Sequence, residues 1–229
     1  MASSNLTLCT GVLSSSDTAR GVTTGTTKPN GGGNFVYVMN SRTAAEGTVA
    51  LFANQANFAP TATGADVSAA MVRLAGGGPA GWSAYVFAAL SGPSVDDTGY
   101  LLGLSDGDPC HVELRKGVLG VGLPDETPLG ANTVLRRSTL TVPIATWVHL
   151  RLEVVVQPFG DVILNCYQSD LGAHAVSAPT WVAIAGMDPF TDDVAGIATG
   201  SLPYTTGRAG FGVRVDDVTR RAAFDYLKV

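Results

Sequence analysis

The stretch of residues 147–168 restricts the fold of this 229-residue chain more than any other part of its sequence. Apolar residues fall at every second position on both sides of a Pro158-Phe159-Gly160 segment. They are Val148, Leu150, Leu152, Val154 and Val156 before the segment, and Val162, Leu164 and Cys166 after it. Because side chains alternate between the two faces of a strand, this pattern predicts two antiparallel strands that bury one face.

The Pro158-Phe159-Gly160 segment also sets the register of the predicted hairpin. A three-residue loop needs a left-handed residue near its end, and Gly160 supplies it. The resulting pairs are Val156 with Val162, Val154 with Leu164, Glu153 with Asn165, and Arg151 with Tyr167. A slip of one residue would set core residues against polar ones, so we expect this register to hold.

Short apolar and β-branched runs, each bounded by turn residues, recur through the rest of the chain. They span residues 35–39, 48–52, 82–90, 99–104 and 111–115. Their length and spacing are typical of an all-β sandwich or barrel. Only 14% of the residues are charged and 28 are glycine, which favours short strands and turns over helices. Residues 67–74 have apolar positions at helical spacing, yet the strands around them favour a strand here as well.

The end of the chain is predicted to form a second strand pair. Its apolar residues on one face are Phe211, Val213 and Val215, followed after a turn at Asp216-Asp217 by Phe224 and Tyr226. We expect the second strand to return beside the first, with these side chains on the same face.

The first 33 residues differ in composition from the rest, since 18 of them are Ser, Thr or Gly. Such a segment buries little apolar surface by itself. One interpretation is a loosely ordered terminus with a single edge strand near residues 6–9. The other is an arm that orders against a neighbouring subunit. We therefore divide the chain into an N-terminal arm, residues 1–33, and one sandwich domain, residues 34–229.

Charge and cysteine content exclude several classes of protein. The net charge is −5, and no basic run exceeds the pairs at residues 136–137 and 220–221, so we expect no nucleic-acid binding. No stretch of 18 apolar residues occurs, so we expect no membrane span. The three cysteines are widely spaced and form no CxxC pair, which favours small apolar residues in a reducing cytosol over a disulfide framework or a zinc site.

Three motifs in the second half of the chain carry a family resemblance. They are Trp147-Val148-His149-Leu150-Arg151-Leu152, Gly207-Arg208-Ala209-Gly210-Phe211 and Phe224-Asp225-Tyr226. In this order they resemble the concanavalin A-like lectin/glucanase superfamily, which includes laminin G-like domains, over residues 82–229. The resemblance implies an all-β jelly roll, in which two curved antiparallel sheets pack face to face and one concave face is available for binding. These motifs mark the fold and not an activity.

Glycosidases of that superfamily use paired carboxylates, which lie in a Glu-x-Asp-x-Glu-like cluster on one strand. The glutamates of this chain are Glu46, Glu113, Glu126 and Glu153, and none lies in such a cluster. The serines and histidines form no nucleophile or metal-ligand motif either. We therefore predict no catalytic residues and no enzymatic activity.

The polar side of the predicted hairpin is the candidate ligand-binding surface. It carries His149, Arg151, Glu153, Asn165 and Tyr167. Trp147, at its start, adds an aromatic ring, as Trp82 and Trp181 do elsewhere, and such rings either stack on sugars or fill a core. The alternative for the whole surface is the ordinary solvated side of a sandwich strand.

An acidic loop is the candidate metal site. It contains Asp188, Asp192 and Asp193, and Ca2+ prefers converging carboxylate and carbonyl oxygens. The spacing differs from the calcium motif of legume-type lectins, and a solvated acidic loop is the alternative. No other cofactor is expected.

Three functions are compatible with these features. The first is a structural protein of a virus particle, such as a capsid decoration or a tail- or fibre-associated component of a bacteriophage, made in the host cytoplasm. Sparse charge, the N-terminal arm and the lack of catalytic clusters favour it, and its partners would be other virion proteins and copies of itself in a homo-oligomer. The alternative is a lectin-like carbohydrate-binding module, with host glycans among its ligands. A polysaccharide hydrolase ranks third.

Overall fold

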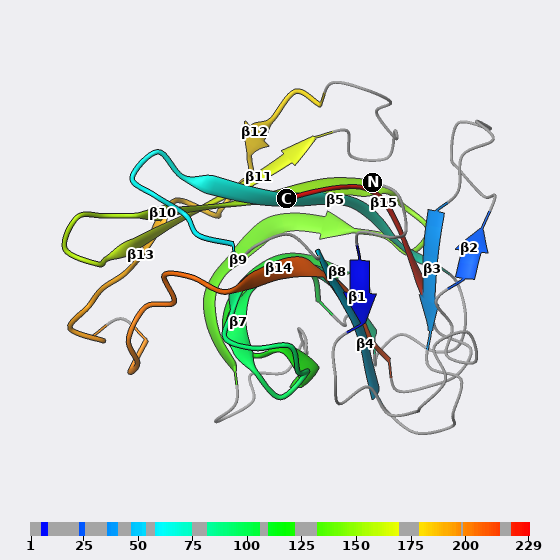
Figure 1. Ribbon diagram of the computed structural model, residues 1–229. Coiled ribbons are helices and arrows are strands. Elements are labelled where there is room, and N and C mark those ends of the chain that lie inside the picture. The colour runs from blue at the N-terminus through cyan, green and yellow to red at the C-terminus, as the bar shows by residue number, and fades with distance from the viewer. Residues whose placement is uncertain are drawn as a thin grey trace.

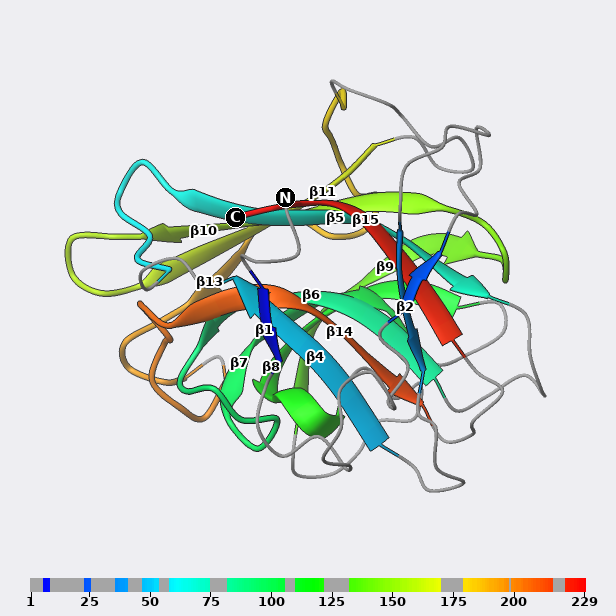
Figure 2. The same ribbon diagram turned by 45° about the vertical axis from the view of Figure 1, so that its right-hand side comes forward.

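The computed structural model of this chain is built almost entirely from strands (Figure 1). It describes residues 6–8, 23–25, 36–40, 47–53, 58–74, 82–105, 110–121, 132–169, 179–197, 199–215 and 221–229. Two antiparallel sheets lie one above the other and enclose the main apolar core, as the turned view in Figure 2 also shows. The prediction of an all-β sandwich of two antiparallel sheets is confirmed.

The lower sheet in Figure 1 has seven strands in the order β1-β4-β14-β6-β7-β8-β9. Their bounds are β1 Leu6–Leu8, β4 Gly47–Ala53, β14 Arg208–Val215, β6 Trp82–Leu90, β7 Thr98–Leu104, β8 Cys110–Val118 and β9 Asn132–Val142. A short 3-10 helix, η3 (Leu119–Val121), follows β8. The apolar runs predicted at 48–52, 82–90, 99–104 and 111–115 are strands of this sheet, whereas β9 was not predicted.

The upper sheet has eight strands, seven of them in the order β12-β11-β10-β5-β15-β3-β2, and β13 also pairs with β11. Their bounds are β12 Val182–Ala183, β11 Val162–Ser169, β10 Val148–Val156, β5 Ala65–Leu74, β15 Arg221–Lys228, β3 Val36–Asn40, β2 Thr23–Gly25 and β13 Phe190–Asp192. Strand β5 confirms the strand interpretation of residues 67–74. Both faces of β5 are buried, which explains why its apolar residues do not alternate.

Strands β10 and β11 form the predicted hairpin in the predicted register. Val156 pairs with Val162, and the pairing continues without a shift to His149 and Ser169. Gly160 has a φ of 95°, and its amide donates to the carbonyl of Gln157 at 2.9 Å within the loop. The even-numbered residues of β10 from 148 to 154 and those of β11 from 162 to 166 lie in the main core, so the odd-numbered side chains point outward.

The last two strands do not form the predicted pair. β14 pairs with β4 and β6 in the seven-stranded sheet, whereas β15 pairs with β3 and β5 in the eight-stranded sheet. Phe211 and Phe224 still meet, since their ring centroids lie 4.7 Å apart within the core. Alternation marks which side of a strand faces the core, but it does not say which sheet the strand joins. The side chains of Val215 and Tyr226 lie outside the described part of the structure.

The described cysteines behave as small apolar residues. Cys110 and Cys166 are free thiols in the main core, and Cys9 lies outside the described residues. Burial raises the pKa of the Cys166 thiol to about 12. The Cys166 thiol is therefore unreactive in the folded protein at neutral pH.

Two short stretches of the predicted N-terminal arm are described, and each joins a sheet. β1 pairs with β4, and β2 pairs with β3. β1 coincides with the edge strand expected near residues 6–9. The other arm residues lie outside the described ranges, so the boundary at residue 33 stays a prediction. In the described ranges, no helix is both long and apolar enough to cross a membrane.

Candidate functional site

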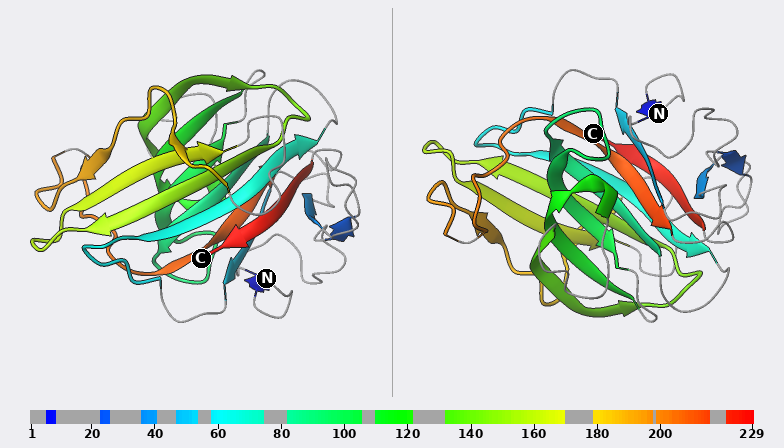
Figure 3. Two further views of the ribbon diagram at one scale, coloured as in Figure 1. Left: turned by 90° about the horizontal axis from the view of Figure 1, so that it is seen from above. Right: turned by 90° about the horizontal axis from the view of Figure 1, so that it is seen from below.

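The outer face of the eight-stranded sheet carries the predicted polar residues. Figure 3 shows this sheet from above, with β11, β10, β5 and β15 side by side. The hairpin register sets Arg151 beside Tyr167 and Glu153 beside Asn165. The neighbouring strand β5 brings Asp66 opposite Glu153. Polar side chains from three adjacent strands therefore meet on one surface.

The guanidinium of Arg151 lies at the centre of this group. Its Nε is 3.0 Å from Oδ2 of Asp66, and its Nη2 donates to Oε1 of Glu153 at 3.0 Å. It also lies over the ring of Tyr167, 5.2 Å from the ring centroid. The side chains of Arg151, Asp66 and Glu153 are each 22% exposed. Two carboxylates thus fix the arginine while solvent still reaches it.

Glu153 links the two strands of the hairpin. Its Oε2 accepts a hydrogen bond from Nδ2 of Asn165 at 2.9 Å and another from the Tyr167 hydroxyl at 3.3 Å. Burial and the neighbouring Glu153 carboxylate raise the pKa of Tyr167, so its hydroxyl is protonated and donates at neutral pH. Both oxygens of Glu153 are therefore engaged by neighbouring donors.

Trp181 flanks the same group, from a position just before the edge strand β12. That strand pairs with β11, where Ala183 lies opposite Tyr167. The Trp181 ring meets the His149 ring edge-on, with centroids 4.7 Å apart. Its centroid also lies 5.9 Å from the guanidinium carbon of Arg151. Trp181 and Tyr167 thus place two aromatic rings beside one arginine.

We call this group the outer polar patch. It consists of Asp66, His149, Arg151, Glu153, Asn165, Tyr167 and Trp181. The structure brings together all of the predicted ligand-contact residues except Trp147. That ring is packed in an apolar cluster with Ala70, Val72 and Ala223. The hairpin pattern did not predict Asp66 or Trp181 for this surface, because neither residue belongs to the hairpin.

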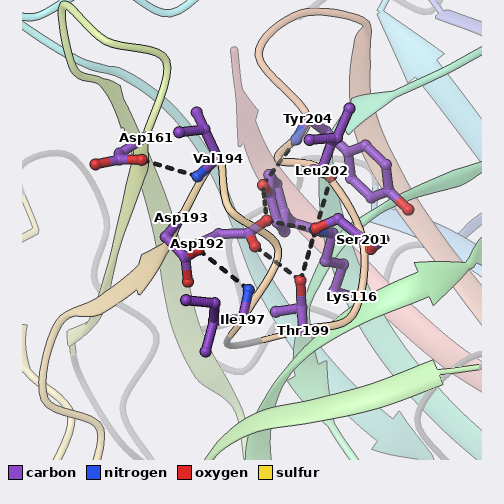
Figure 4. Close-up of polar contacts among 11 residues, drawn as sticks. Lys116, Asp161, Asp192, Asp193, Val194, Ile197, Thr199, Ser201, Leu202 and Tyr204 are labelled. Atoms are coloured by element: carbon purple, nitrogen blue, oxygen red, sulfur yellow. Dashed lines mark hydrogen bonds and ion pairs between the residues drawn. The ribbon is translucent and has the colours of Figure 1, made fainter.

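Asp192 of the acidic loop lies in a network of polar contacts, which Figure 4 shows. Asp192 is fully buried, and its Oδ2 lies 2.7 Å from Nζ of Lys116 in β8. The Tyr100 hydroxyl donates to Oδ2 at 2.5 Å, and Thr199 Oγ1 donates to Oδ1 at 2.9 Å. Burial and the hydrogen bond to Asp192 raise the pKa of Tyr100. Asp192 is therefore an internal ion-pair partner and not part of a solvated loop.

The ammonium of Lys116 also contacts the loop between β13 and β14. Its Nζ lies 2.9 Å from the Ser201 carbonyl, 2.8 Å from the Leu202 carbonyl and 2.9 Å from Thr199 Oγ1. The Lys116 side chain is only 3% exposed. We call Tyr100, Lys116, Asp192 and Thr199 the buried anchor cluster, because together they fasten this loop to the seven-stranded sheet.

The other two predicted metal ligands do not join Asp192. Asp193 accepts a hydrogen bond from the backbone amide of Ile197 at 3.1 Å, which closes a turn of the loop. Asp188 is exposed, and its backbone carbonyl accepts from Nε of Arg136 at 3.1 Å. Among the described residues, no group of three or more His, Cys, Asp or Glu side chains is placed to hold a metal ion.

A further carboxylate, Glu113, lies in the seven-stranded sheet. Its Oε2 accepts from Nε of Arg115 at 2.7 Å, and its Oε1 accepts from Nε of Arg137 at 2.6 Å. The Glu113 and Arg115 side chains are fully buried. Two guanidinium groups thus occupy both oxygens of the carboxylate. Glu46 and Glu126 lie outside the described residues.

Comparison with known proteins gives likenesses of structure only. No family model matches the chain, and no curated protein matches it in sequence. The marine PL-14 alginate lyase from Aplysia kurodai matches with a TM-score of 0.51 and 9% identity, over 90% of this chain and 85% of that one. The carbohydrate-binding module CBM66 from Bacillus subtilis matches with a TM-score of 0.49 and 13% identity, over 97% and 93%. A legume lectin-like domain from Entamoeba histolytica has a TM-score of 0.49 and 8% identity, over 98% and 89%.

At such low identity the likeness to the alginate lyase concerns the fold alone. That protein is a lyase, so a sandwich of this shape is compatible with catalysis as well as with binding. The expectation that this chain is not an enzyme therefore stays a prediction. Its function has to be argued from the contacts of its own residues.

Proposed function

We propose that this protein is a lectin-like carbohydrate-binding module and that the outer polar patch contacts its ligand. One observation carries the proposal. A partly exposed arginine, Arg151, is held by two carboxylates and flanked by the rings of Tyr167 and Trp181.

The chemistry of this surface matches the chemistry of a sugar. A sugar ring presents an apolar face of C–H groups and a rim of hydroxyls. Aromatic rings such as those of Tyr167 and Trp181 offer apolar area with a polar edge. Carboxylate, amide and guanidinium groups accept from or donate to hydroxyls in fixed directions. The patch offers both kinds of contact on one surface.

The patch is also organised before any ligand arrives. Arg151 forms ion pairs with Asp66 and Glu153, and Glu153 in turn accepts hydrogen bonds from Asn165 and Tyr167. Fixing a flexible side chain on binding costs about 0.5–1.5 kcal/mol, so side chains that are already fixed favour binding. Cross-strand ion pairs also occur on ordinary solvated strand faces. The combination of linked polar side chains with the partly exposed rings of Tyr167 and Trp181 is what supports a binding surface over that alternative.

The test is a titration of the protein with a broad panel of oligosaccharides, followed by tryptophan fluorescence and calorimetry. We expect at least one saccharide to bind and Trp181→Ala to weaken its binding by about tenfold or more, which corresponds to about 1.4 kcal/mol. Phe159→Ala is the matched control, because it removes a ring that is 90% exposed at the tip of the same hairpin. The proposal is wrong if the wild-type protein binds no member of the panel, or if both variants weaken binding equally.

A structural role in a virus particle, as a capsid decoration or tail component of a bacteriophage, is the second candidate. Phe159, Ile197 and Leu202 are 90%, 86% and 68% exposed in two loops. The loops are joined at one end of the sandwich, where the amide of Val194 donates to Asp161 at 2.8 Å. Exposed apolar side chains on anchored loops suit contacts with other proteins, here virion subunits or copies of this chain.

Light scattering on the full chain tests the self-association part of this second candidate. We expect a defined oligomer, and we expect the double substitution Phe159→Ser and Ile197→Ser to shift it towards monomer. If the wild-type protein is monomeric at every concentration, the predicted self-association through this end of the sandwich is wrong.

A further inference from the structure

We infer that the outer polar patch selects neutral glycans and discriminates against glycans that carry carboxylate or sulfate groups. This inference rests on the proposed function and specifies its ligand class. Three features of the patch support it: the pairing of its cation, its excess of carboxylates and the kind of hydrogen-bonding group left for a ligand.

Arg151, the cation of the patch, is already paired, since Asp66 and Glu153 bind it at 3.0 Å each. Lys228, outside the patch at the end of β15, lies 3.8 Å from Oδ2 of Asp66 and is 72% exposed, so its pairing is weak. A ligand carboxylate or sulfate would have to compete with the two protein carboxylates for Arg151. Such competition removes most of the gain that an anionic ligand normally obtains from an arginine.

Carboxylates outnumber cations in the patch. Asp66 and Glu153 belong to the patch, and Asp225 lies two strands from His149, opposite Ala70 of β5. Phe224 faces the core, so alternation puts Asp225 on the outer face. Within the patch itself, the two carboxylates of Asp66 and Glu153 outnumber the one cation, Arg151, which leaves a small negative balance. A bound anion would be repelled at short range, where the loss of solvent strengthens the repulsion.

Two acceptor oxygens of the patch have no partner among the described residues. Within the described residues, Oδ2 of Asp66 and Nδ2 of Asn165 have protein partners, whereas Oδ1 of Asp66 and Oδ1 of Asn165 have none. These oxygens need a donor. A sugar hydroxyl can donate, but an ionised carboxylate or a sulfate offers only acceptors. These two atoms therefore favour a sugar hydroxyl and disfavour a carboxylate or sulfate group placed against them.

The experiment compares pairs of glycans in which one member carries acidic groups and the other is neutral. The probes are polygalacturonate and alginate, each paired with its carboxyl-reduced neutral form, and a sialylated glycan paired with its desialylated form. Binding is measured by biolayer interferometry at low and at physiological salt. We expect at least one neutral probe to bind and its acidic counterpart to bind at least tenfold more weakly, with the difference shrinking as salt rises.

A charge-changing variant separates electrostatics from shape. Asp66→Asn removes one carboxylate beside Arg151 and should reduce the discrimination, mainly by strengthening binding of the acidic form. Asp188→Asn is the matched control, because it removes the same charge from an exposed residue outside the patch. We expect this control to keep the wild-type ratio of neutral to acidic binding.

The experiment distinguishes a failure of the proposed selectivity from a failure of the proposed carbohydrate binding. If an acidic probe binds as tightly as its neutral form, or more tightly, the selectivity is overturned while the carbohydrate-binding proposal stands. If no probe of either kind binds, the proposed function is overturned and the selectivity with it. A ratio unchanged by Asp66→Asn also contradicts the inference, because it removes the electrostatic cause.

Discussion

The outer polar patch and the buried anchor cluster are built from the same three kinds of side chain. Each combines a tyrosine hydroxyl, a carboxylate and a basic group: Tyr167, Glu153 and Arg151 in the first, and Tyr100, Asp192 and Lys116 in the second. Glu153 and Arg151 are 22% exposed, whereas Asp192 and Lys116 are 0% and 3% exposed. The chemical classes of these three side chains are therefore the same in the two regions, and burial is the main difference.

The difference in burial assigns the two regions different tasks. Inside the protein, a charge without a partner is costly, so the anchor cluster must be complete for the fold to hold. At the surface, water replaces a lost partner, so the patch contributes little to stability and can exchange partners with a ligand. The largest predicted effects therefore concern the stability of the anchor cluster, and smaller ones concern binding at the patch.

Breaking the buried ion pair should give the largest effect. Lys116→Met leaves the Asp192 carboxylate buried without its cation, and we expect the free energy of unfolding to fall by about 3–5 kcal/mol. Urea denaturation monitored by tryptophan fluorescence measures this. The double variant Lys116→Met with Asp192→Leu removes both charges and should recover part of the loss. A single variant as stable as the wild-type protein would contradict the assignment of this pair as an anchor.

Removing one tyrosine hydroxyl from each region should lower the free energy of unfolding more in the anchor cluster than in the patch. Tyr100→Phe takes a donor from Asp192 and an acceptor from the backbone amide of Tyr204, both in a buried setting. We expect it to lower the free energy of unfolding by about 1–3 kcal/mol. Tyr167→Phe loses only a partly exposed contact and should cost less than about 0.5 kcal/mol. Equal effects in urea denaturation would show that burial does not separate the two regions.

Substitution at the centre of the patch should weaken glycan binding and change the free energy of unfolding only slightly. Glu153→Ala removes the acceptor that orders Arg151, Asn165 and Tyr167. We expect glycan affinity to fall by about tenfold, or about 1.4 kcal/mol, while the free energy of unfolding changes by less than about 1 kcal/mol. Calorimetry and urea denaturation on the same sample give both values. A large loss of stability with unchanged affinity would reverse the comparison.

The smallest predicted effect is the loss of stability at alkaline pH that is caused by the Cys166 thiol on the inner face of β11. Burial raises the pKa of Cys166 from its ordinary value of 9.0 to about 12, so the folded protein holds this proton after the unfolded chain has released it. Stability is therefore full below pH 9 and falls as the pH rises from 9 towards 12. At pH 9.5 the thiol should lower the free energy of unfolding by about 0.8 kcal/mol relative to pH 7.

Cys166→Ala is the control for this pH effect, because it removes the thiol from the inner face of β11 and leaves Tyr167 on the outer face. The difference in stability between wild type and variant should shrink by that amount at pH 9.5. Buried Tyr100, whose pKa is also raised, acts in the same direction in both proteins and cancels in the comparison. A wild-type protein and variant with parallel pH profiles would contradict the burial of the thiol.

The hairpin of β10 and β11 could be predicted in full from the sequence, because both of its determinants are local. Alternation gave the inward face, and Gly160 gave the loop and therefore the register. The sheet assignment of β14 and β15 could not be predicted, since strands of either sheet present the same apolar pattern to a shared core. The strand β9 was missed because polar and charged residues interrupt its pattern, including Arg136 and Arg137.

Only part of the candidate site could be predicted from the sequence. Cross-strand pairing in the hairpin placed Glu153 near Asn165 and Arg151 near Tyr167, but Asp66 joins them from a strand more than 80 residues earlier. The acidic loop shows the opposite case. Nothing in the local sequence around Asp192 indicates that Lys116 and Tyr100 come from another sheet to bury it.

The anchor cluster also bears on the order of events in folding. Tyr100 and Asp192 are separated by 92 residues and lie in strands of opposite sheets, so their contact can form only after both sheets have met. Closing so long a loop is slow, and a contact made late is absent from the transition state. Such contacts slow unfolding and leave the folding rate nearly unchanged. We therefore expect the cluster to set how long each folded molecule persists, and its loss to appear as faster unfolding in stopped-flow experiments.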